Sequence, residues 1–584
     1  MEITRRTLFG AGAAAGAGLL LAPVITSTAS AAVPTGVTPF TEQLPTLAEL
    51  GVIDATGGGS ATIEMVNATH QFHSAMAATP TFAYRGGTVS QNYLGPVIVA
   101  KQGVPFDLTV VNSLGAHPLA SAIDYNFAGT VAADATGPRA SVHLHGGNTS
   151  PGNDGDPTDT FVTGASKTYH YGNTQEAAGL WYHDHALGIT RLNVFAGLAG
   201  GYLVRNGDDP GDGTTGLPPA PFEEPLVIQD RMFNSDGTFL YPPNENPGTA
   251  GRPWAPEFFG DVATVNGKAW PNLNVARGKY RFRVYNGSNA RFYNLNLKSA
   301  GQANTFFQIG SDGGLLNAPV PLRTLLLGPG ERADIVIDFA GLKPGAKVVL
   351  TNDARVPFPD GPRGVRRGGS PLPEIMQFSV TSAPGWTAPL PVTLRAVPIA
   401  PLATAARPVA AIRTMTMVEN LNALGSPLMA LLNNRTFEAP GATTTVGANS
   451  LEQWDLVNTT VDAHPIHLHF TQFQVLNRQK FDSAGYLAAN YGPQPLAPDG
   501  GSFPPPAVAS FLRGGPQAPP ANERGWKDTV VAMPGEVTRI VVPFGANAAG
   551  SVTAFQTSFT GPYVWHCHIL EHEDNDMMQR YVID

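Results

Sequence analysis

The sequence predicts an all-β protein built from three β-sandwich units. Charged residues make up only 14% of the 584 residues, and 65 glycines and 52 prolines separate many short runs rich in valine, threonine and phenylalanine. Short apolar runs bounded by turn residues are typical of sandwiches and barrels. A chain of this length needs more than one core, so about three to four domains are expected. A strand pattern that recurs at domain spacing favours three.

The N-terminal residues 1–31 are expected to be an export signal and not part of the fold. A twin-arginine pattern, TRRTLF, is followed at 10–24 by a core rich in alanine, glycine and leucine. This core is shorter than the ~20 residues that a membrane span needs, which favours a cleaved signal over an anchor. The sequence ASA at 29–31 offers a small-residue cleavage site. We therefore expect a periplasmic or extracellular protein without stable membrane association.

Three similar strands mark the three units. Each closes on asparagine: VPFDLTVVN ends at Asn112, YRFRVYN at Asn286 and LEQWDLVN at Asn458. These asparagines are 174 and 172 residues apart, which is typical of a domain-sized repeat. Segments rich in proline at 208–221 and 383–408 are predicted to be linkers. The predicted domains span residues 40–207, 220–382 and 405–584.

Ten of the 14 histidines fall in four short clusters, and each cluster contains an HxH pair. Side chains two apart on a strand project from the same face, so both imidazoles of a pair can reach one metal site. No histidine lies between His185 and His464, so the first and third units should carry the ligands and the middle unit none. The paired residues are His143, His145, His183, His185, His467, His469, His566 and His568.

The only cysteine lies in the last cluster, which reads HCHILEHEDNDMM. Cys567 sits between two of the paired histidines, and His572 and Met577 follow. A thiolate, two imidazoles and a weak axial thioether make a blue-copper site, and His464 is left over to complete that set. Alternate side chains on a strand face opposite ways, so Cys567 faces one metal and its neighbours another. The whole inventory indicates one mononuclear copper and a three-copper cluster. A structural zinc site would not explain so many ligands, because it closes with four.

These motifs resemble those of the multicopper oxidases. HLHG at 143–146, WYHDH at 181–185, HPIHLH at 464–469 and the tail look like the four copper motifs of that family. HLHGGNTSPGNDGD, WYHDHALGITRLNVFAGLA, QIGSDGG and GWKDT are similar to the branch of spore-coat laccases and bilirubin oxidases. The resemblance covers nearly the whole mature chain. It implies three cupredoxin-like Greek-key β-sandwich domains.

The resemblance also implies a role for each ligand and four copper ions per chain. The residues that match type 1 copper ligands are His464, Cys567, His572 and Met577. Those that match type 2 ligands are His143 and His467. The six that match the type 3 pair are His145, His183, His185, His469, His566 and His568.

The activity implied by the resemblance is that of a laccase. Phenols or aromatic amines would give single electrons to the type 1 copper through the edge of His572 or His464. Cys567 would pass them to the three-copper cluster, where four electrons reduce dioxygen to two waters; the metals perform the redox chemistry. Glu573 and Asp154 match acidic residues near that cluster in spore-coat laccases, and we expect both to deliver protons.

Other functions stay open at this level. A bilirubin oxidase, an aminophenol-coupling oxidase similar to phenoxazinone synthase or a metal-ion oxidase would differ in the loops at 459–463 and 493–520. A non-enzymatic copper carrier would need only Cys567 and its partners, and a copper nitrite reductase would lack the paired histidines. The net charge of −9 and the lack of a basic run argue against nucleic-acid binding. A monomer is the favoured state.

Overall fold

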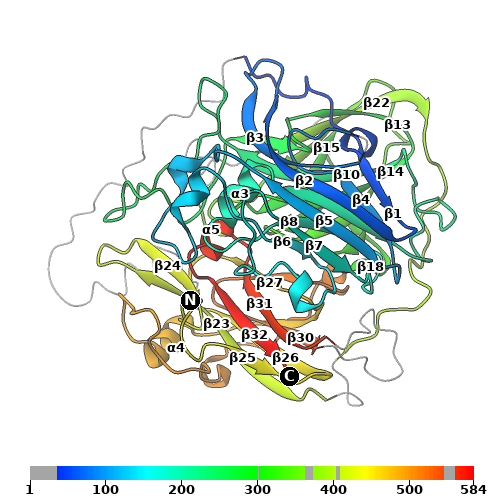
Figure 1. Cartoon of the computed structure of the whole chain (residues 1–584). Coiled ribbons are helices and arrows are strands. Elements are labelled where there is room, and N and C mark those ends of the chain that lie inside the picture. The colour runs from blue at the N-terminus through cyan, green and yellow to red at the C-terminus, as the bar shows by residue number, and fades with distance from the viewer. Residues whose placement is uncertain (1–35, 88, 300–301, 362–371, 403–407, 545–558) are drawn as a thin grey trace.

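The computed structural model describes residues 36–87, 89–299, 302–361, 372–402, 408–544 and 559–584 (Figure 1). Strands hold 43% of the chain and helices 8%, which confirms the predicted all-β class. The predicted export signal at 1–31 lies outside the described residues. Within them, no helix is long and apolar enough to cross a membrane.

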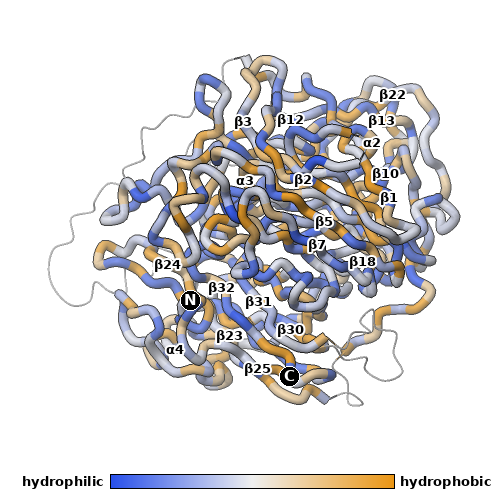
Figure 2. The backbone as a smooth tube through the Cα atoms, in the orientation of Figure 1, coloured by the Kyte–Doolittle hydropathy of each residue, from blue (hydrophilic) through white to orange (hydrophobic). Residues whose placement is uncertain are grey.

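The first part of the chain forms two sheets that enclose one apolar core. Phe106, Leu108 and Val110 are buried in this core, while the residues between them are more exposed, which is the period of a half-buried strand. Along such strands the chain changes between hydrophobic and hydrophilic residues (Figure 2). One sheet has the order β1 (Val52–Ala55), β4 (Val97–Lys101), β9 (Ala199–Arg205), β8 (Gly179–Asp184), β6 (Val142–His145). The other has the order β3 (Thr79–Arg85), β2 (Gly59–His70), β5 (Phe106–Ser113), β7 (Ser166–Tyr171).

The middle part also has two sheets, and its core includes Phe282 and Phe378, whose ring centroids lie 5.1 Å apart. One sheet has the order β12 (Lys268–Ala269), β11 (Val262–Val265), β10 (Glu223–Arg231), β14 (Lys279–Asn286), β20 (Arg332–Asp338), β17 (Phe306–Ser311), β18 (Gly314–Leu322). The other has the order β13 (Asn272–Arg277), β22 (Glu374–Pro384), β21 (Lys347–Asn352), β15 (Tyr293–Ser299), β16 (Gln302–Asn304), and β19 (Thr324–Leu327) pairs with β15.

The last part repeats the arrangement, with Trp454 and Trp565 in edge-to-face contact between its sheets at 5.6 Å. One sheet has the order β24 (Pro427–Leu432), β23 (Ala411–Leu421), β26 (Ser450–Asn458), β30 (Glu536–Phe544), β28 (Gln474–Lys480). The other has the order β25 (Thr444–Val446), β32 (Met578–Ile583), β31 (Gly561–Cys567), β27 (His464–Leu468), β29 (Thr529–Ala532). The described α-helices are short: α2 (Leu47–Leu50), α3 (Thr190–Ala196), α4 (Ser483–Asn490) and α5 (Leu570–Glu573).

The three predicted repeat strands occupy the same place in each part. β5, β14 and β26 each pair in parallel with an earlier strand and antiparallel with a later one. Their closing asparagines, Asn112, Asn286 and Asn458, are buried, and each side-chain amide donates to two backbone carbonyls. Each side-chain carbonyl accepts from the backbone N–H two residues later. The shared asparagine therefore ties the end of the strand to neighbouring loops, while the predicted domain boundaries stay a prediction.

The predicted linker at 208–221 is anchored at its start. Asp209 is buried, and both of its carboxylate oxygens accept from the guanidinium of Arg281 on β14, at 2.7 and 2.9 Å. Arg283 donates to the same carboxylate at 2.6 Å. Because a buried carboxylate paired with guanidinium groups is costly to separate from them, this end of the segment is held against the middle part.

Candidate metal centre

Two pairs of strands from opposite ends of the chain carry the clustered histidines. β6 and β8 pair antiparallel with His143 opposite His183, and β27 and β31 pair antiparallel with His467 opposite His566. Directly opposed residues in such a ladder project from the same face of the sheet. Each strand pair therefore presents imidazoles on one face, and the two faces meet.

One imidazole from each strand pair meets the other at the centre: the Nε2 atoms of His143 and His467 lie 3.4 Å apart. His143 Nδ1 lies 2.6 Å from the backbone carbonyl oxygen of Asp154, and His467 Nδ1 lies 2.9 Å from that of Asp528. A carbonyl only accepts, so each Nδ1 carries the proton and each Nε2 of a neutral ring presents a lone pair. Two lone pairs that face each other repel, and a cation between them removes the repulsion.

Two further groups of three imidazoles lie beside this pair. In one group, the Nε2 atoms of His185 and His469 lie 3.3 and 3.2 Å from Nε2 of His566. The ligand atoms of the other group lie within 4.8 Å of one another, and that group consists of His145, His183 and His568. All eight of these imidazoles are buried. The HxH pairs of β8 and β31 are each divided between the two groups, so one member of each pair lies with either set of three imidazoles.

The partners of the ring nitrogens fit metal ligands. His183 Nδ1 donates to the Asp184 carbonyl and His566 Nδ1 to the Cys567 carbonyl, at 2.8 and 3.1 Å. Several other ring nitrogens are buried and make no hydrogen bond, namely His145 Nδ1, His183 Nε2, His185 Nδ1 and both nitrogens of His568. Histidines that bind metals commonly donate their second ring N–H to a carbonyl or carboxylate and turn the bare nitrogen to the ion.

The fourth group surrounds the cysteine. Cys567 Sγ lies 3.6 Å from Nδ1 of His464 and 3.7 Å from Nδ1 of His572. His464 Nε2 donates to the hydroxyl of Thr460 at 2.7 Å, which leaves its Nδ1 bare toward the sulfur. Met577 is fully buried, and its backbone carbonyl accepts from the Cys567 N–H at 3.0 Å. The structure thus brings His464, Cys567 and His572 together, and a backbone hydrogen bond joins Met577 to Cys567.

Burial keeps two of these histidines and the cysteine neutral in the absence of a metal. It lowers the pKa of His185 to about 4 and that of His572 to about 3, and raises the pKa of the Cys567 thiol well above its ordinary value. A neutral imidazole is the form that binds a metal, so the histidines need no deprotonation at neutral pH. The thiol has to lose its proton to become a ligand, so metal binding at this group releases a proton.

The two predicted proton carriers lie against the histidine groups. Asp154 Oδ2 lies 2.7 Å from His469 Nδ1, and burial raises the pKa of this carboxyl to about 8. Glu573 lies 3.1 Å from His566 Nδ1 and 3.5 Å from His185 Nε2, and burial raises its pKa as well. Both carboxyl groups are almost completely buried. Neither belongs to the solvated surface.

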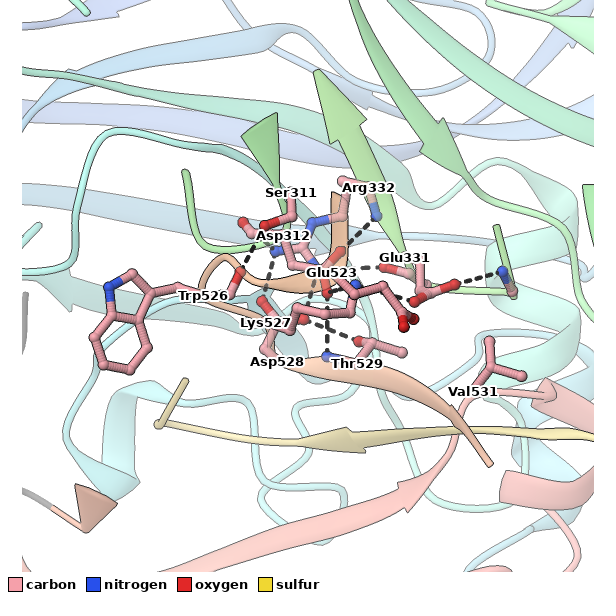
Figure 3. A network of polar contacts seen from close by, with 12 residues as sticks. Ser311, Asp312, Glu331, Arg332, Glu523, Trp526, Lys527, Asp528, Thr529 and Val531 are labelled. Atoms are coloured by element: carbon pink, nitrogen blue, oxygen red, sulfur yellow. Dashed lines mark hydrogen bonds and ion pairs between the residues drawn. The ribbon is translucent and has the colours of Figure 1, made fainter. Parts of the chain in front are cut away.

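Sequence reasoning missed a set of polar residues behind the histidines. Asp528 and Thr529 both contact His145 Nε2 at 3.1 Å, and Arg332 forms a two-pronged ion pair with Asp528 (Figure 3). The stretches QIGSDGG and GWKDT pointed to this region only as matches to a family branch. No spacing in the sequence indicates that residues of the middle part reach Asp528.

A small surface pocket lies beside the cysteine group. Thr459, Thr460 and Val461 line it together with Gln494, so the two loops that were expected to surround the type 1 site meet there. Thr460 covers the Nε2 atom of His464, which is 1% exposed, whereas His572 is 7% exposed. His572 is therefore the most exposed residue among the clustered histidines, although it is still largely buried.

Comparisons with known proteins agree with this geometry. Residues 135–209 and 407–584 match family models described as multicopper oxidase. The chain is 37% identical over 541 residues to a laccase of Bacillus subtilis, covering 88% of this chain and 93% of that protein. It is 35% identical to the multicopper oxidase LPR1 of Arabidopsis thaliana, covering 92% of each. The structure is similar to the McoA multicopper oxidase of Aquifex aeolicus, with a TM-score of 0.70, 25% identity and coverage of 94% of this chain and 100% of that chain.

Proposed function

Because the chain belongs to the multicopper oxidase family, we propose that it is an exported, laccase-like oxidase of phenols and aromatic amines that reduces dioxygen to water. The observation that carries this proposal is the convergence of bare imidazole nitrogens from β6 and β27 at 3.4 Å. The likeness to a laccase along most of both chains supports the donor class. Export rests on the twin-arginine pattern at 1–31, and the monomeric state stays an expectation.

The residues fit four copper ions. A soft thiolate with two imidazoles and a thioether selects copper, and imidazole groups suit it as well. We assign His464, Cys567, His572 and Met577 to a type 1 ion, and His143 and His467 to a type 2 ion. The type 3 pair would be held by His145, His183 and His568 on one side and by His185, His469 and His566 on the other. When bound, these ions supply the redox chemistry, taking single electrons from the donor and giving four to dioxygen.

The chain's own contribution begins with the tail. Cys567 lies between His566 and His568 on consecutive residues, so the cysteine group and both three-imidazole groups are joined by a few covalent bonds. Asp574, just after the tail helix, accepts from the backbone N–H groups of Thr190 and Arg191 at 3.0 Å. The tail is thereby fastened to α3, which follows the second histidine cluster of the first part.

The donor is proposed to approach the ring edge of His572. His572 is the most exposed residue among the clustered histidines, while Thr460 covers His464. A metal-bound imidazole that lies this near the surface would let an aromatic donor pass an electron without entering the protein. Phenols and aromatic amines need no deep pocket for such contact, and the loops at 459–463 and 493–520 would set the preference among them.

Two acids are proposed to hold and supply the protons that dioxygen reduction consumes. Asp154 Oδ2 and His469 Nδ1 lie 2.7 Å apart and can share one proton. Glu573 can hold another within reach of His566 Nδ1, at 3.1 Å. Burial raises the pKa of each carboxyl, so each keeps a proton nearer to neutral pH than an exposed acid does.

The test is steady-state oxygen uptake by the copper-loaded protein with a donor panel of phenols, aromatic amines, bilirubin, o-aminophenols, Cu(I) and Mn(II). The proposal expects uptake with the phenolic and aromatic amine donors. Preferential use of bilirubin, o-aminophenols or a metal ion would contradict the proposed donor class but not the assignment to the multicopper oxidase family. A blue protein that binds one copper and consumes no dioxygen would reject the enzyme in favour of a carrier.

A further inference from the structure

The middle part of the chain supplies no histidine, yet it touches the centre at several points. Gly330 has φ +82°, and a Cβ placed there would lie 2.7 Å from the His568 ring. A Cβ on Gly146, the residue after His145, would lie 2.6 Å from Arg332 Nη2. The backbone of the middle part thus lies against the His568 ring, and its Arg332 lies against Gly146, the residue after His145.

Arg332, the first residue of β20, contacts both parts that carry histidines. Its Nη1 and Nη2 atoms donate to the two carboxylate oxygens of Asp528, each at 2.6 Å. Its Nε donates to the carbonyl of Gly179, the first residue of β8, at 3.2 Å. The side chain is 3% exposed, so the ion pair lies out of solvent. A two-pronged pair fixes the orientation of the carboxylate as well as its charge.

Asp528 passes this orientation to two histidines from different parts. Its Oδ1 lies 3.1 Å from Nε2 of His145 on β6, and its backbone carbonyl accepts from Nδ1 of His467 on β27 at 2.9 Å. His145 Nδ1, on the other side of that ring, is buried without a hydrogen bond. The carboxylate therefore decides which nitrogen of His145 carries the proton and which faces the metal.

Arg332 is itself held in place. Its backbone N–H donates to Asp312 Oδ1 at 2.8 Å, and its Nη2 donates to the Asp312 carbonyl at 3.0 Å. Lys527 pairs with Asp312 Oδ2 at 2.9 Å and with Glu331 at 3.0 Å (Figure 3). These contacts hold the guanidinium in place, so that it can keep the Asp528 carboxylate in one orientation.

We propose that Arg332 is a positioning residue of the metal centre: by fixing Asp528 it sets the ring nitrogens that His145 and His467 turn to the metal. This inference rests on the proposed function, since it concerns retention of the type 2 copper and the type 3 copper held by His145. Within the described residues, Arg332 and Asp528 form no hydrogen bond or ion pair with His464, Cys567 or His572. The type 1 copper should therefore not depend on this pair. The middle part would then complete a centre to which it gives no ligand.

Three variants test the inference. Arg332→Met removes the guanidinium and keeps much of the side-chain length, and Arg332→Lys keeps the charge but loses the fork. Arg281→Met is the matched control, because Arg281 is equally buried on β14 and also forms a two-pronged pair, with Asp209. The carboxylates that pair with Arg281 belong to Asp209, Glu223 and Asp334, and none of them contacts a histidine in the described part of the chain. Because Arg281 also pairs with Glu223 and Asp334, Arg281→Met should lose at least as much folding stability as Arg332→Met.

The readouts are copper per chain after dialysis against a graded chelator, blue absorbance for type 1 copper and the paramagnetic resonance signal of type 2 copper. We expect Arg332→Met to hold type 2 copper about 10- to 100-fold more weakly, with unchanged blue absorbance, and Arg332→Lys to lie in between. Arg281→Met should keep both signals. Equal copper loss in both methionine variants, or full type 2 retention in Arg332→Met, would overturn the inference. A wild-type protein without a type 2 signal would instead reject the proposed function.

Discussion

His143 and His467 stand 324 positions apart in the chain, and their Nε2 atoms face each other at 3.4 Å. Hydrogen bonds from their Nδ1 atoms to backbone carbonyls leave both facing nitrogens without a proton. This relationship joins the first and last parts of the chain around a place suited to a cation. The following predictions concern that place and the groups beside it.

Removal of copper should lower the stability of the protein. The ligands come from two distant parts of the chain, so metal binding holds those parts together, and a ligand at 100 times its Kd adds about 2.7 kcal/mol. Calorimetry of copper-loaded and chelator-stripped protein should show the lower melting temperature in the stripped form. In His143→Ala the gap between the two forms should shrink. Equal melting temperatures of both wild-type forms would contradict the assignment of a metal to this place.

Replacement of the cysteine should separate the two kinds of copper site. Cys567→Ser removes the thiolate that selects copper at the mononuclear group, so blue absorbance and donor oxidation should be lost. The three imidazole groups should keep about three copper ions per chain by metal analysis. Thr459→Ser, a mild change beside the pocket, serves as the control and should stay blue. A Cys567→Ser protein that is still blue would place the type 1 ion elsewhere.

Asp154→Asn should remove a proton source. Burial raises the pKa of Asp154 to about 8, so the carboxyl holds its proton below pH 8 and loses it above. Wild-type turnover should therefore fall as pH rises through about 8. The variant should be slower by about 100-fold at lower pH and lack this inflection. Asp159→Asn, at an exposed carboxyl on the same part of the chain, is the control, and a profile of Asp154→Asn equal to that of the control would reject the role.

Glu573→Gln should slow oxygen consumption without slowing reduction of the type 1 copper. The carboxyl lies 3.1 Å from His566 Nδ1, and among the described residues it forms no hydrogen bond with the cysteine sulfur. Stopped-flow bleaching of the blue band by a donor under anaerobic conditions measures the first step, and oxygen uptake measures the whole cycle. Glu573→Asp keeps the acid on a shorter stem and should recover part of the turnover. Unchanged turnover of Glu573→Gln across pH would sink this assignment.

The repeat and the ligand types could be predicted from the sequence, because both depend on local pattern. Apolar pairs or alternation identified β5, β14 and β26, and the asparagine that closes each made the repeat visible. The reason for the repeated asparagine is one hydrogen-bond pattern at three strand ends. The sequence does not show this pattern, because the accepting carbonyls lie in loops whose positions only the fold gives. The all-β class and the family were confirmed, whereas the domain boundaries stay predictions.

The grouping of the histidines could not be predicted, because it depends on how two sheets meet. An HxH pair predicts two imidazoles on one face, but it does not tell which partners each imidazole meets. His183 lies in one group of three, and His185, just beyond the end of β8, lies in the other. The ion pair of Arg332 and Asp528 joins residues 196 positions apart. Neither residue lies in a histidine motif, so only the folded chain shows that they stand behind His145.

The measurement that tests the account most directly is the stoichiometry of the complete reaction. Copper-loaded protein is supplied with a one-electron phenolic donor in a sealed oxygen electrode, and oxidised donor, dioxygen consumed and hydrogen peroxide are quantified together. The account predicts four donor molecules oxidised for each dioxygen consumed, with no peroxide formed. Two donors per dioxygen with accumulating peroxide, or no oxygen uptake at all by protein that carries its full copper, would contradict it.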